Sequence, residues 1–263
     1  MTSRSFFAGV LFAAIAWAQG PAPNGIMHVA FRVTDIQKTS QFYQKLGFEQ
    51  AITFEDAGKV SVAFMKVNDR QFIEMYPRTA DSQPLGLMHI CFETSDVEAL
   101  RNEYIKRDLK PAKANKGRAG NLVFSIHDPE GQTVEFLQFL PGSVHAEGKG
   151  KFLGEHRISQ HLLRAVTTVR NLDAERDFYI EKLDLKSVGG SGAVRLRVPG
   201  NSGDEVGMES GSGAKPGIVF EVANVKSAAK DLRGRGFTVE KGAHQVWIAD
   251  PDGARIAFAK AVR

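Results

Sequence analysis

Two histidines and two glutamates recur in this sequence at a fixed spacing. His28 and His89 lie 61 positions apart, Glu74 and Glu135 lie 61 positions apart, and each His precedes its Glu by 46 positions. Two imidazoles and two carboxylates form a ligand set that suits a divalent Zn, Fe, Mn, Co or Ni ion. With open coordination positions, such an ion polarises a carbonyl or enediolate oxygen or binds O2.

The segments around these residues repeat as well. The stretch 25–33 (GIMHVAFRV) returns as 86–94 (GLMHICFET), and Asp35 returns as Asp96. A single His or Glu on a strand is usually structural, but four residues related by one repeat are not independent coincidences. We therefore predict one metal site, with a single divalent ion held by His28, Glu74, His89 and Glu135.

Strand alternation indicates where these side chains point. In the stretch 26–33, Val29 and Phe31 share an apolar face, whereas His28 shares the other face with Ala30. We expect helices to cover the apolar faces, which leaves the His and Glu side chains on the open, concave face of a sheet. A carboxylate buried there without a partner is unfavourable, and a bound cation would remove that cost.

Each copy of the repeat reads as a β-α-β-β-β module. The first module has a strand at 26–33, a helix from Asp35 to about Leu46, and strands near 49–55, 59–67 and 70–76. The second has a strand at 87–94, a helix at 97–107 capped by Asp96, and strands near 110–114, 121–127 and 132–139. Asp and Asn are favoured helix N-caps, and Gly favours helix ends and turns.

The same pattern returns, more weakly, in the second half of the chain. A strand is predicted at 161–169, a helix capped by Asn171 follows, and the turn 250–253 (DPDG) echoes 128–131 (DPEG). Residues 200–216 are rich in Gly and Ser and should hold one short strand. The fold class is therefore α+β, with four modules paired into two domains at 26–140 and 158–262 and a linker at 141–157. Each domain should be a curved mixed sheet with helices on its convex side.

Composition excludes some classes of protein. The 263 residues are 43% hydrophobic and 24% charged with a net charge of +4, which is typical of a globular protein. The basic residues are scattered among acidic ones, so we expect no nucleic-acid partner. Cys91 is the only cysteine, and an intrachain disulfide is therefore impossible.

The first 18 residues are typical of a signal peptide. Arg4 precedes an apolar run from Phe6 to Trp17, and Ala16-Trp17-Ala18 fits a small-x-small cleavage site before Gln19. The run is short for a membrane span. We expect an exported protein, periplasmic or secreted, with no membrane attachment after cleavage.

With these features, the chain resembles the vicinal oxygen chelate superfamily, which includes glyoxalase I, bleomycin-resistance proteins, methylmalonyl-CoA epimerase and extradiol dioxygenases. The resemblance covers both domains and rests on the paired modules, the 35–48 helix segment, the 128–136 ending and the His/Glu positions. It implies a metal held in a cup between two modules by His28, Glu74, His89 and Glu135. Four such ligands resemble the glyoxalase I and epimerase pattern, while His28, His89 and Glu135 could also supply the two-His, one-Glu set of the dioxygenases.

The second domain departs from that pattern. Alignment of the modules places Arg164 at the His28 position, Gly217 at the His89 position and Ala257 at the Glu135 position, with Glu209 matching Glu74. We expect no metal there, and instead a role in packing, in closing the first cup or in binding a ligand without metal. His161 is out of register and is expected to be structural.

Weaker candidates surround the predicted site. Arg32 and Tyr76 are candidates for substrate binding, although Arg32 could instead pair with Glu93 and Tyr76 could be a plain wall residue. His127 could donate a proton. Cys91 is expected to be a small wall residue, because nothing near it in sequence suggests a lowered pKa.

The resemblance and the ligand set together favour an exported metalloenzyme acting on a small molecule chelated through two adjacent oxygens. In a glyoxalase- or epimerase-like isomerase or lyase, Glu135 or Glu74 would act as the general base. An extradiol-type dioxygenase is the close alternative. A protein that only sequesters a small molecule, and an accessory protein with an empty cup, are the other hypotheses. A monomer or a homodimer fits each of them.

Overall fold

The protein is described by a computed structural model that covers residues 21–188, 194–211 and 216–261. The expected signal peptide at 1–18 lies outside these described residues. Within them, no helix is both long enough and apolar enough to cross a membrane.

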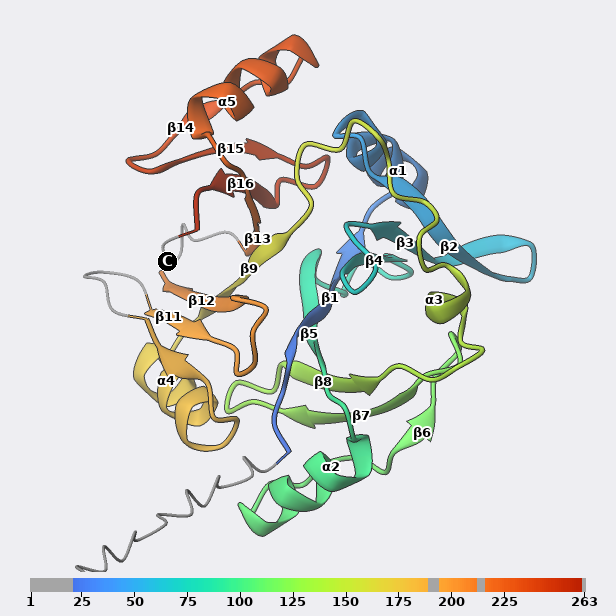
Figure 1. Ribbon diagram of the computed structural model, residues 1–263, viewed down its shortest axis with the longest axis vertical. Helices are drawn as coiled ribbons and strands as arrows, with labels where there is room; N and C mark the ends of the chain where they lie inside the picture. Colours follow the sequence, from blue (N-terminus) through green and yellow to red (C-terminus); the bar gives the residue numbers. More distant parts are fainter. Residues whose placement is uncertain (1–20, 189–193, 212–215, 262–263) are drawn as a thin grey trace, which may run out of the picture.

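The first half of the chain forms one eight-stranded sheet, with the strand order β2-β3-β4-β1-β5-β8-β7-β6. Strand β1 runs parallel to β4 and antiparallel to β5, and β5 runs parallel to β8. The two modules therefore pair within one chain, through β1 and β5 (Figure 1). The elements are β1 (Gly25–Val33), α1 (Ile36–Lys45), β2 (Glu49–Asp56), β3 (Lys59–Lys66), β4 (Phe72–Pro77), β5 (Gly86–Glu93), α2 (Val97–Lys106), β6 (Asn115–Lys116), β7 (Leu122–His127) and β8 (Thr133–Gln138).

The second half repeats this topology in a second eight-stranded sheet, with the order β10-β11-β12-β9-β13-β16-β15-β14. A short helix, α3 (Val144–Glu147), lies between the two sheets in the sequence. The elements of the second half are β9 (Leu162–Val169), α4 (Leu172–Glu181), β10 (Lys186–Ser187), β11 (Val194–Arg197), β12 (Glu205–Ser210), β13 (Gly217–Glu221), α5 (Val225–Gly234), β14 (Glu240–Lys241), β15 (Gln245–Ala249) and β16 (Arg255–Ala259).

The predicted fold class is confirmed: the chain is α+β and consists of four β-α-β-β-β modules in two mixed sheets. Its helices begin where their caps predict. Asp35, Asp96 and Asn171 each accept a hydrogen bond from the backbone N–H three residues later. One predicted strand is wrong, since 110–114 is irregular and the pairing is limited to β6 at 115–116. Pro111 has no N–H to give to a ladder, which disfavours a strand there.

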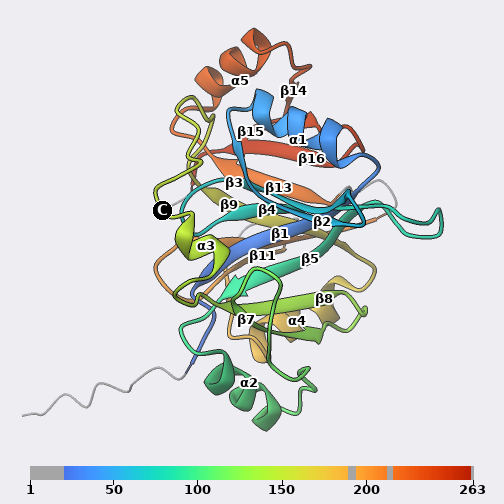
Figure 2. The same ribbon diagram turned by 90° about the vertical axis from the view of Figure 1, so that its right-hand side faces the viewer.

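One apolar core joins the two domains. It includes the convex face of each sheet and the inner faces of the helices. Phe48 stacks on Phe220 with ring centroids 4.9 Å apart, and Phe42 meets Phe237 edge-on at 5.4 Å. The four longer helices gather in two pairs at opposite ends of the molecule, α1 with α5 and α2 with α4, while the short α3 lies apart from them (Figures 1 and 2). The domains are therefore packed together through the sides of the sheets that carry the helices.

The two echoed turns connect the domains in a symmetric way. Glu130, in the 128–131 turn, accepts hydrogen bonds from the backbone N–H groups of Arg170 and Asn171 at 2.6 and 2.7 Å. Asp252, in the 250–253 turn, accepts from the backbone N–H and the hydroxyl of Thr34 at 2.9 and 2.5 Å. Each turn thus holds the loop that precedes the first helix of the other domain. These contacts leave both concave faces open.

Candidate metal centre

Four adjacent strands each contribute one polar side chain to the concave face of the first sheet. In the strand order β4-β1-β5-β8, these side chains are Glu74, His28, His89 and Glu135. We call the surface around them the first cup. His28, Glu74 and His89 are buried, with 4%, 5% and 7% of their surface exposed. The four residues predicted from the repeat therefore do meet at one place.

The donor atoms of these residues are spaced as the ligands of one metal ion would be. The two His Nε2 atoms lie 2.9 Å apart. Glu74 Oε2 lies 3.1 and 3.3 Å from the two Nε2 atoms, and Glu135 Oε2 lies 3.7 and 3.4 Å from them. Ligands bound at about 2.1 Å lie roughly 3.0 Å apart at right angles and roughly 3.4 Å apart at tetrahedral angles. His28, Glu74 and His89, whose donor atoms all lie within 4.8 Å of one another, therefore fit a divalent cation, and Glu135 lies beside the same two histidines.

A β-bulge changes the surroundings of His28. The β1–β5 register shifts between Ile26 and His28, so that Met27 and His28 both face the cup instead of alternating. The Nδ1 of His28 lies 2.9 Å from Met27 Sδ. A proton on Nδ1 would be shared with the sulfur, which leaves the Nε2 lone pair free for a metal. Strict alternation would have placed Met27 in the opposite core.

Tyr76 holds Glu74 in place. The Tyr76 hydroxyl donates a 2.8 Å hydrogen bond to Glu74 Oε1, and this leaves Oε2 directed at the histidines. Burial and the charge of Glu74 raise the pKa of Tyr76 well above its usual value, so the hydroxyl stays protonated. Burial by itself would raise the pKa of the Glu74 carboxyl, but the attraction of His28 and the hydrogen bonds from both imidazoles hold it well below its usual range. Glu74 is thus a fixed anion.

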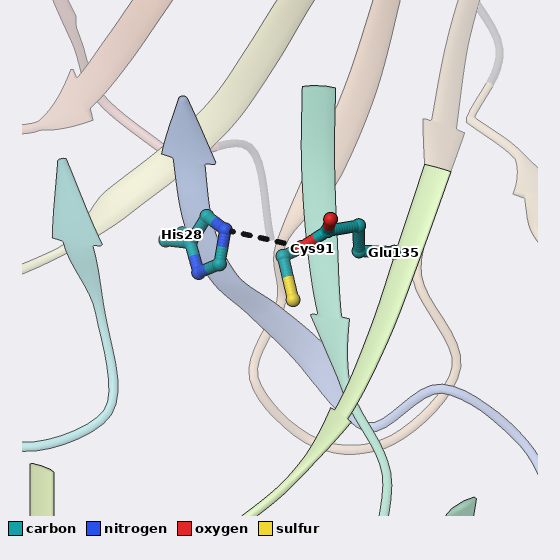
Figure 3. Close-up of side chains that lie close together, drawn as sticks. All are labelled: His28, Cys91 and Glu135. Atoms are coloured by element: carbon teal, nitrogen blue, oxygen red, sulfur yellow. Dashed lines mark ion pairs between the residues drawn. The ribbon is translucent and has the colours of Figure 1, made fainter. Parts of the chain in front are cut away.

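Glu135 is held less tightly than Glu74. Its side chain is 26% exposed, against 7% for the side chain of Glu74. Figure 3 shows Glu135 reaching toward His28 across the strand that carries Cys91. Cys91 is fully buried, and burial followed by the charges of Glu135 and Glu74 raises the pKa of its thiol well above the usual value. Cys91 is therefore a neutral thiol in the wall of the cup, in agreement with its predicted place.

The first cup opens into a cavity of about 440 Å³. Aromatic and aliphatic side chains form much of its wall, together with the polar groups of the cup and other polar side chains. This combination of size and lining is usual for a small-molecule site. The lining side chains include His28, Glu74, Tyr76, Glu135, Phe54, Val62, Phe64, Arg118, Asn121, Val123, Leu137 and His145.

His145 was not predicted, and it comes from the segment 141–157 that was read as a plain linker. It lies in α3, is 3% exposed, and its Nδ1 lies 2.9 Å from the amide nitrogen of Asn121. Burial, followed by the charge of His28, lowers its pKa to about 4, so its imidazole is neutral. The segment is held by Lys66, whose ammonium donates to the carbonyl oxygens of Gly148 and Lys151 at 2.6 and 2.8 Å.

Arg118 was also missed, and it bridges the two modules beside the cavity. Its guanidinium donates to Asp56 at 2.9 Å and to the carbonyl oxygen of Glu55 at 2.8 Å, and it lies 4.7 Å from the centre of the Phe54 ring. The loop before β7 is thereby tied to the β2–β3 hairpin. Arg118 lies between the strands predicted near 110–114 and 121–127, and no local signal indicated its partner.

Two of the weaker candidates lie away from the cavity. Arg32 donates to the carbonyl oxygen of Pro84 at 3.1 Å and does not line the cavity. Its proposed pairing with Glu93 is wrong, because Glu93 binds Arg70 at 2.6 Å instead. His127 is exposed at the end of β7 and does not line the cavity.

The second concave face carries a different set of residues, as predicted. Arg164 occupies the His28 position, and Gly217 and Ala257 occupy the positions of His89 and Glu135. The match of Glu209 to Glu74 is wrong: Gly207 pairs with Val166 as Glu74 pairs with Ala30, so Glu209 stands where Tyr76 does. A Cβ at Gly207 would lie 2.8 Å from Arg164 Cδ, so the arginine fills the space that a carboxylate would need.

His161 bridges two carboxylates at the domain boundary. Its Nε2 lies 2.6 Å from Asp204 Oδ1, and its Nδ1 lies 2.7 Å from Glu221 Oε2. The other oxygen of Asp204 accepts from the backbone N–H of Ile26 in the first domain at 2.6 Å. These contacts link the first strand of one domain to the second domain, away from the first cup.

Comparisons with known proteins point to one group. Residues 25–136 match the sequence model of the Glyoxalase/Bleomycin resistance protein/Dioxygenase superfamily. A "Virulence protein STM3117" of Salmonella typhimurium is 28% identical over 123 residues, which are 44% of this chain and 84% of that protein. The match to the superfamily covers the module pair that forms the first cup.

Solved structures extend the likeness to both domains. The Mn(II)-bound glyoxalase from Novosphingobium aromaticivorans superposes with a TM-score of 0.71 at 17% identity, over 92% of this chain and 84% of that one. The 2,3-dioxygenase LapB from Pseudomonas sp. KL28 gives 0.69 at 14% identity, over 92% and 94% of the two chains. An extradiol ring-cleaving dioxygenase from B. fuscum gives 0.66 at 16% identity, over 93% and 73%. At these identities the likeness shows a common fold.

Proposed function

Since its first domain matches the Glyoxalase/Bleomycin resistance protein/Dioxygenase superfamily and the whole chain shares a fold with members of that group, we propose that this protein is a metal-dependent isomerase or lyase. Its substrate is a small molecule with oxygens on two adjacent carbons. The observation that carries the proposal is the convergence of two imidazole nitrogens and two carboxylates at 2.9–3.7 Å on four neighbouring strands. A protein that only sequesters its ligand has no need of such a set.

The ligands of the proposed ion are His28, Glu74, His89 and Glu135. A divalent ion there would supply a Lewis acid that polarises a substrate carbonyl. The apolar wall formed by Phe54, Phe64 and neighbouring side chains would exclude water from the bound substrate. The oxygens of the substrate would face the His and Glu side chains of the first cup.

The difference between the two glutamates assigns their roles. Glu74 is fixed by the Tyr76 hydroxyl and by both histidines. Glu135 is more exposed, and its polar contacts within the described residues are with the two histidines alone. We therefore assign Glu135 as the general base. The carboxylate of Glu135, no longer bound to the ion, would take the proton from a C–H bond beside the carbonyl, and the electron pair of that bond would move toward the carbonyl oxygen. Glu135 would return the proton to the former carbonyl carbon, and the substrate hydroxyl proton would pass to the oxygen on that carbon.

Metal analysis of the purified protein tests the site. We expect about one equivalent of a divalent transition metal per chain and its loss in the His89→Ala variant. The His127→Ala variant is the matched control, because His127 is exposed and outside the cavity. A protein that takes up no metal, even after reconstitution, would refute the proposal and favour a sequestering or accessory role.

Exchange of the two glutamates for glutamine tests the assignment of the base. General acid–base catalysis contributes roughly 10²- to 10⁴-fold. Glu135→Gln should abolish the exchange of substrate C–H hydrogen with D2O in a panel of 2-hydroxy ketones and 2-oxo acids, while the protein keeps its metal. Glu74→Gln should instead lose metal. Oxygen uptake with catechols and no C–H exchange would identify a ring-cleaving dioxygenase, for which His28, His89 and Glu135 would be the ligands.

We also propose that the protein is exported, on the basis of the pattern in residues 1–18. The mature chain would begin near Gln19. N-terminal sequencing of the protein from a cell-fractionation experiment tests this, and recovery of intact chains in the cytosolic fraction would contradict it.

A further inference from the structure

His161 lies between two carboxylates where the second domain meets the first strand of the first domain. Its Nε2 lies 2.6 Å from Asp204 Oδ1, and its Nδ1 lies 2.7 Å from Glu221 Oε2. Asp204 Oδ2 in turn accepts a 2.6 Å hydrogen bond from the backbone N–H of Ile26, near the start of β1. We propose that protonated His161 fixes this end of β1, and with it His28, and that a rise in pH releases the contact.

The geometry of this contact requires a proton on each nitrogen of the imidazole. An ionised carboxylate only accepts hydrogen bonds, so both nitrogens must donate, and only the imidazolium form has two N–H groups. The side chain of Asp204 is 2% exposed and that of His161 is 24% exposed, so the pair is largely shielded from water. Burial would lower the pKa of His161, but the hydrogen bonds to Asp204 and Glu221 and their charges raise it above its ordinary value. The folded protein therefore favours the charged form.

The other charged side chains around His161 do not take over its role. Arg70, Glu93 and Lys260 line the cavities that adjoin it. Arg70 binds Glu93 at 2.6 Å, Lys260 is exposed, and within the described residues neither cation pairs with Asp204. Loss of the proton from His161 would leave one nitrogen lone pair facing a carboxylate. A buried carboxylate without a partner is unfavourable, so Asp204 would turn toward water and release the backbone of β1.

The backbone that Asp204 holds leads directly into the first cup. The pairing of β1 with β4 begins at His28, so Ile26 lies ahead of it. The register shift that turns Met27 and His28 to the first cup lies between Ile26 and His28. Gly25 packs against the same carboxylate, since a Cβ there would lie 2.7 Å from Asp204 Oδ2. The contact therefore fixes one end of the bulge that places His28, and this part of the inference rests on the metal site proposed above.

Hydrogen exchange of the Ile26 amide in the full mature protein, measured by NMR over a series of pH values and corrected for the intrinsic rate, tests the contact. In the wild type, protection should fall roughly tenfold as the pH rises through the pKa of folded His161, which is the size expected for one hydrogen bond to a charged group. His161→Gln should show the lower protection at every pH. Glu221→Gln should move the midpoint of the fall to lower pH, because it removes a carboxylate that stabilises the imidazolium. His244→Gln changes an exposed histidine of the same domain and should leave the profile unchanged.

Binding of Co(II) tests the effect of the contact on the first cup. The dissociation constant of His161→Gln should exceed that of the wild type several-fold at low pH, and the two should converge at high pH, where the wild type has lost the same contact. Protonation of His28 and His89 affects both proteins alike, so it cancels from the ratio of the two constants.

Three results would contradict the inference. Protection of Ile26 that stays constant with pH in the wild type, or that still falls with pH in His161→Gln, would overturn the contact. A ratio of Co(II) dissociation constants near one at every pH would overturn its effect on His28. The His89→Ala protein should lose metal and keep the exchange profile of the wild type. Failure of the metal site and failure of the contact are therefore distinguishable.

Discussion

Glu175 should make the free energy of unfolding of the protein fall as the pH rises from 5 to 8. It lies on α4 at the domain boundary and is fully buried. Its Oε1 accepts a hydrogen bond from the Glu130 N–H at 2.9 Å, while its Oε2 is buried with no hydrogen-bond partner among the described residues. Burial, and then the negative charge of Asp128, raise the pKa of Glu175 to about 7.

The raised pKa means that Glu175 stabilises the folded protein at low pH more than at high pH. A carboxyl whose pKa is higher in the folded protein than in the unfolded chain favours folding while it is protonated, and this contribution is lost as the pH rises from the unfolded to the folded pKa. For Glu175 that window runs from its ordinary value of 4.5 to about 7. At 1.36 kcal/mol per pKa unit, the loss between pH 5 and pH 8 is about 2–3 kcal/mol.

The variant Glu175→Gln tests this reasoning, because it keeps an acceptor for the Glu130 N–H and removes the ionisable group. We expect its free energy of unfolding in urea, relative to the wild type, to rise by about 2–3 kcal/mol between pH 5 and pH 8. Glu181→Gln, on the exposed end of the same helix, is the matched control and should show no such trend. A Glu175→Gln effect of equal size at both pH values would refute the argument that a buried charge causes it.

Two further predictions concern contacts of the segment between the two domains, one made by Lys66 and the other by Gly47. Lys66→Met removes an ammonium that donates to Gly148 and Lys151; it should lower the free energy of unfolding by at least about 2 kcal/mol, and hydrogen exchange should rise around 148–151. Gly47→Ala should destabilise the protein by more than Gly58→Ala when both are compared by chemical denaturation. Both glycines have positive φ, +90° and +73°, but only a Cβ at Gly47 meets neighbouring backbone. Equal losses in the two glycine variants would contradict the steric argument.

The repeat was enough to predict the first cup, because the two modules that carry the repeated residues pair directly through β1 and β5. Strands β1 and β5 are antiparallel, so a residue and its copy lie on opposite sides of a local two-fold axis. Near the axis such pairs meet, as His28 and His89 do. Far from it they separate, and Arg32 pairs with Gly86 while Glu93 pairs with Gly25. The expected Arg32–Glu93 ion pair does not form, because the antiparallel strands place these two residues at opposite ends of the pairing.

The parts of the site that the sequence did not predict depend on tertiary contacts. His145 lies in a segment without apolar periodicity, and its place is set by Lys66 and Asn121, which are distant in sequence. A bulge brought Met27 to the concave face, and no turn residue marks it. The error at Glu209 arose in a Gly- and Ser-rich stretch, where the alignment of a short strand can slip by two residues and keep the same face.

The concave faces of the two domains show how one scaffold carries different polar groups. Both are built on the central strands of a sheet whose helix-covered face is packed into a common core, so substitutions on the concave face need not disturb the packing. In the first cup, carboxylates approach imidazoles on facing strands and a cation would satisfy both. In the second domain, Gly207 stands at the position of Glu74, and the side chain of Arg164 fills the space beside it. Gly207 thus removes a carboxylate and makes room for an arginine, while Gly217 and Ala257 take the positions of His89 and Glu135, so none of the four predicted ligands recurs in the second domain.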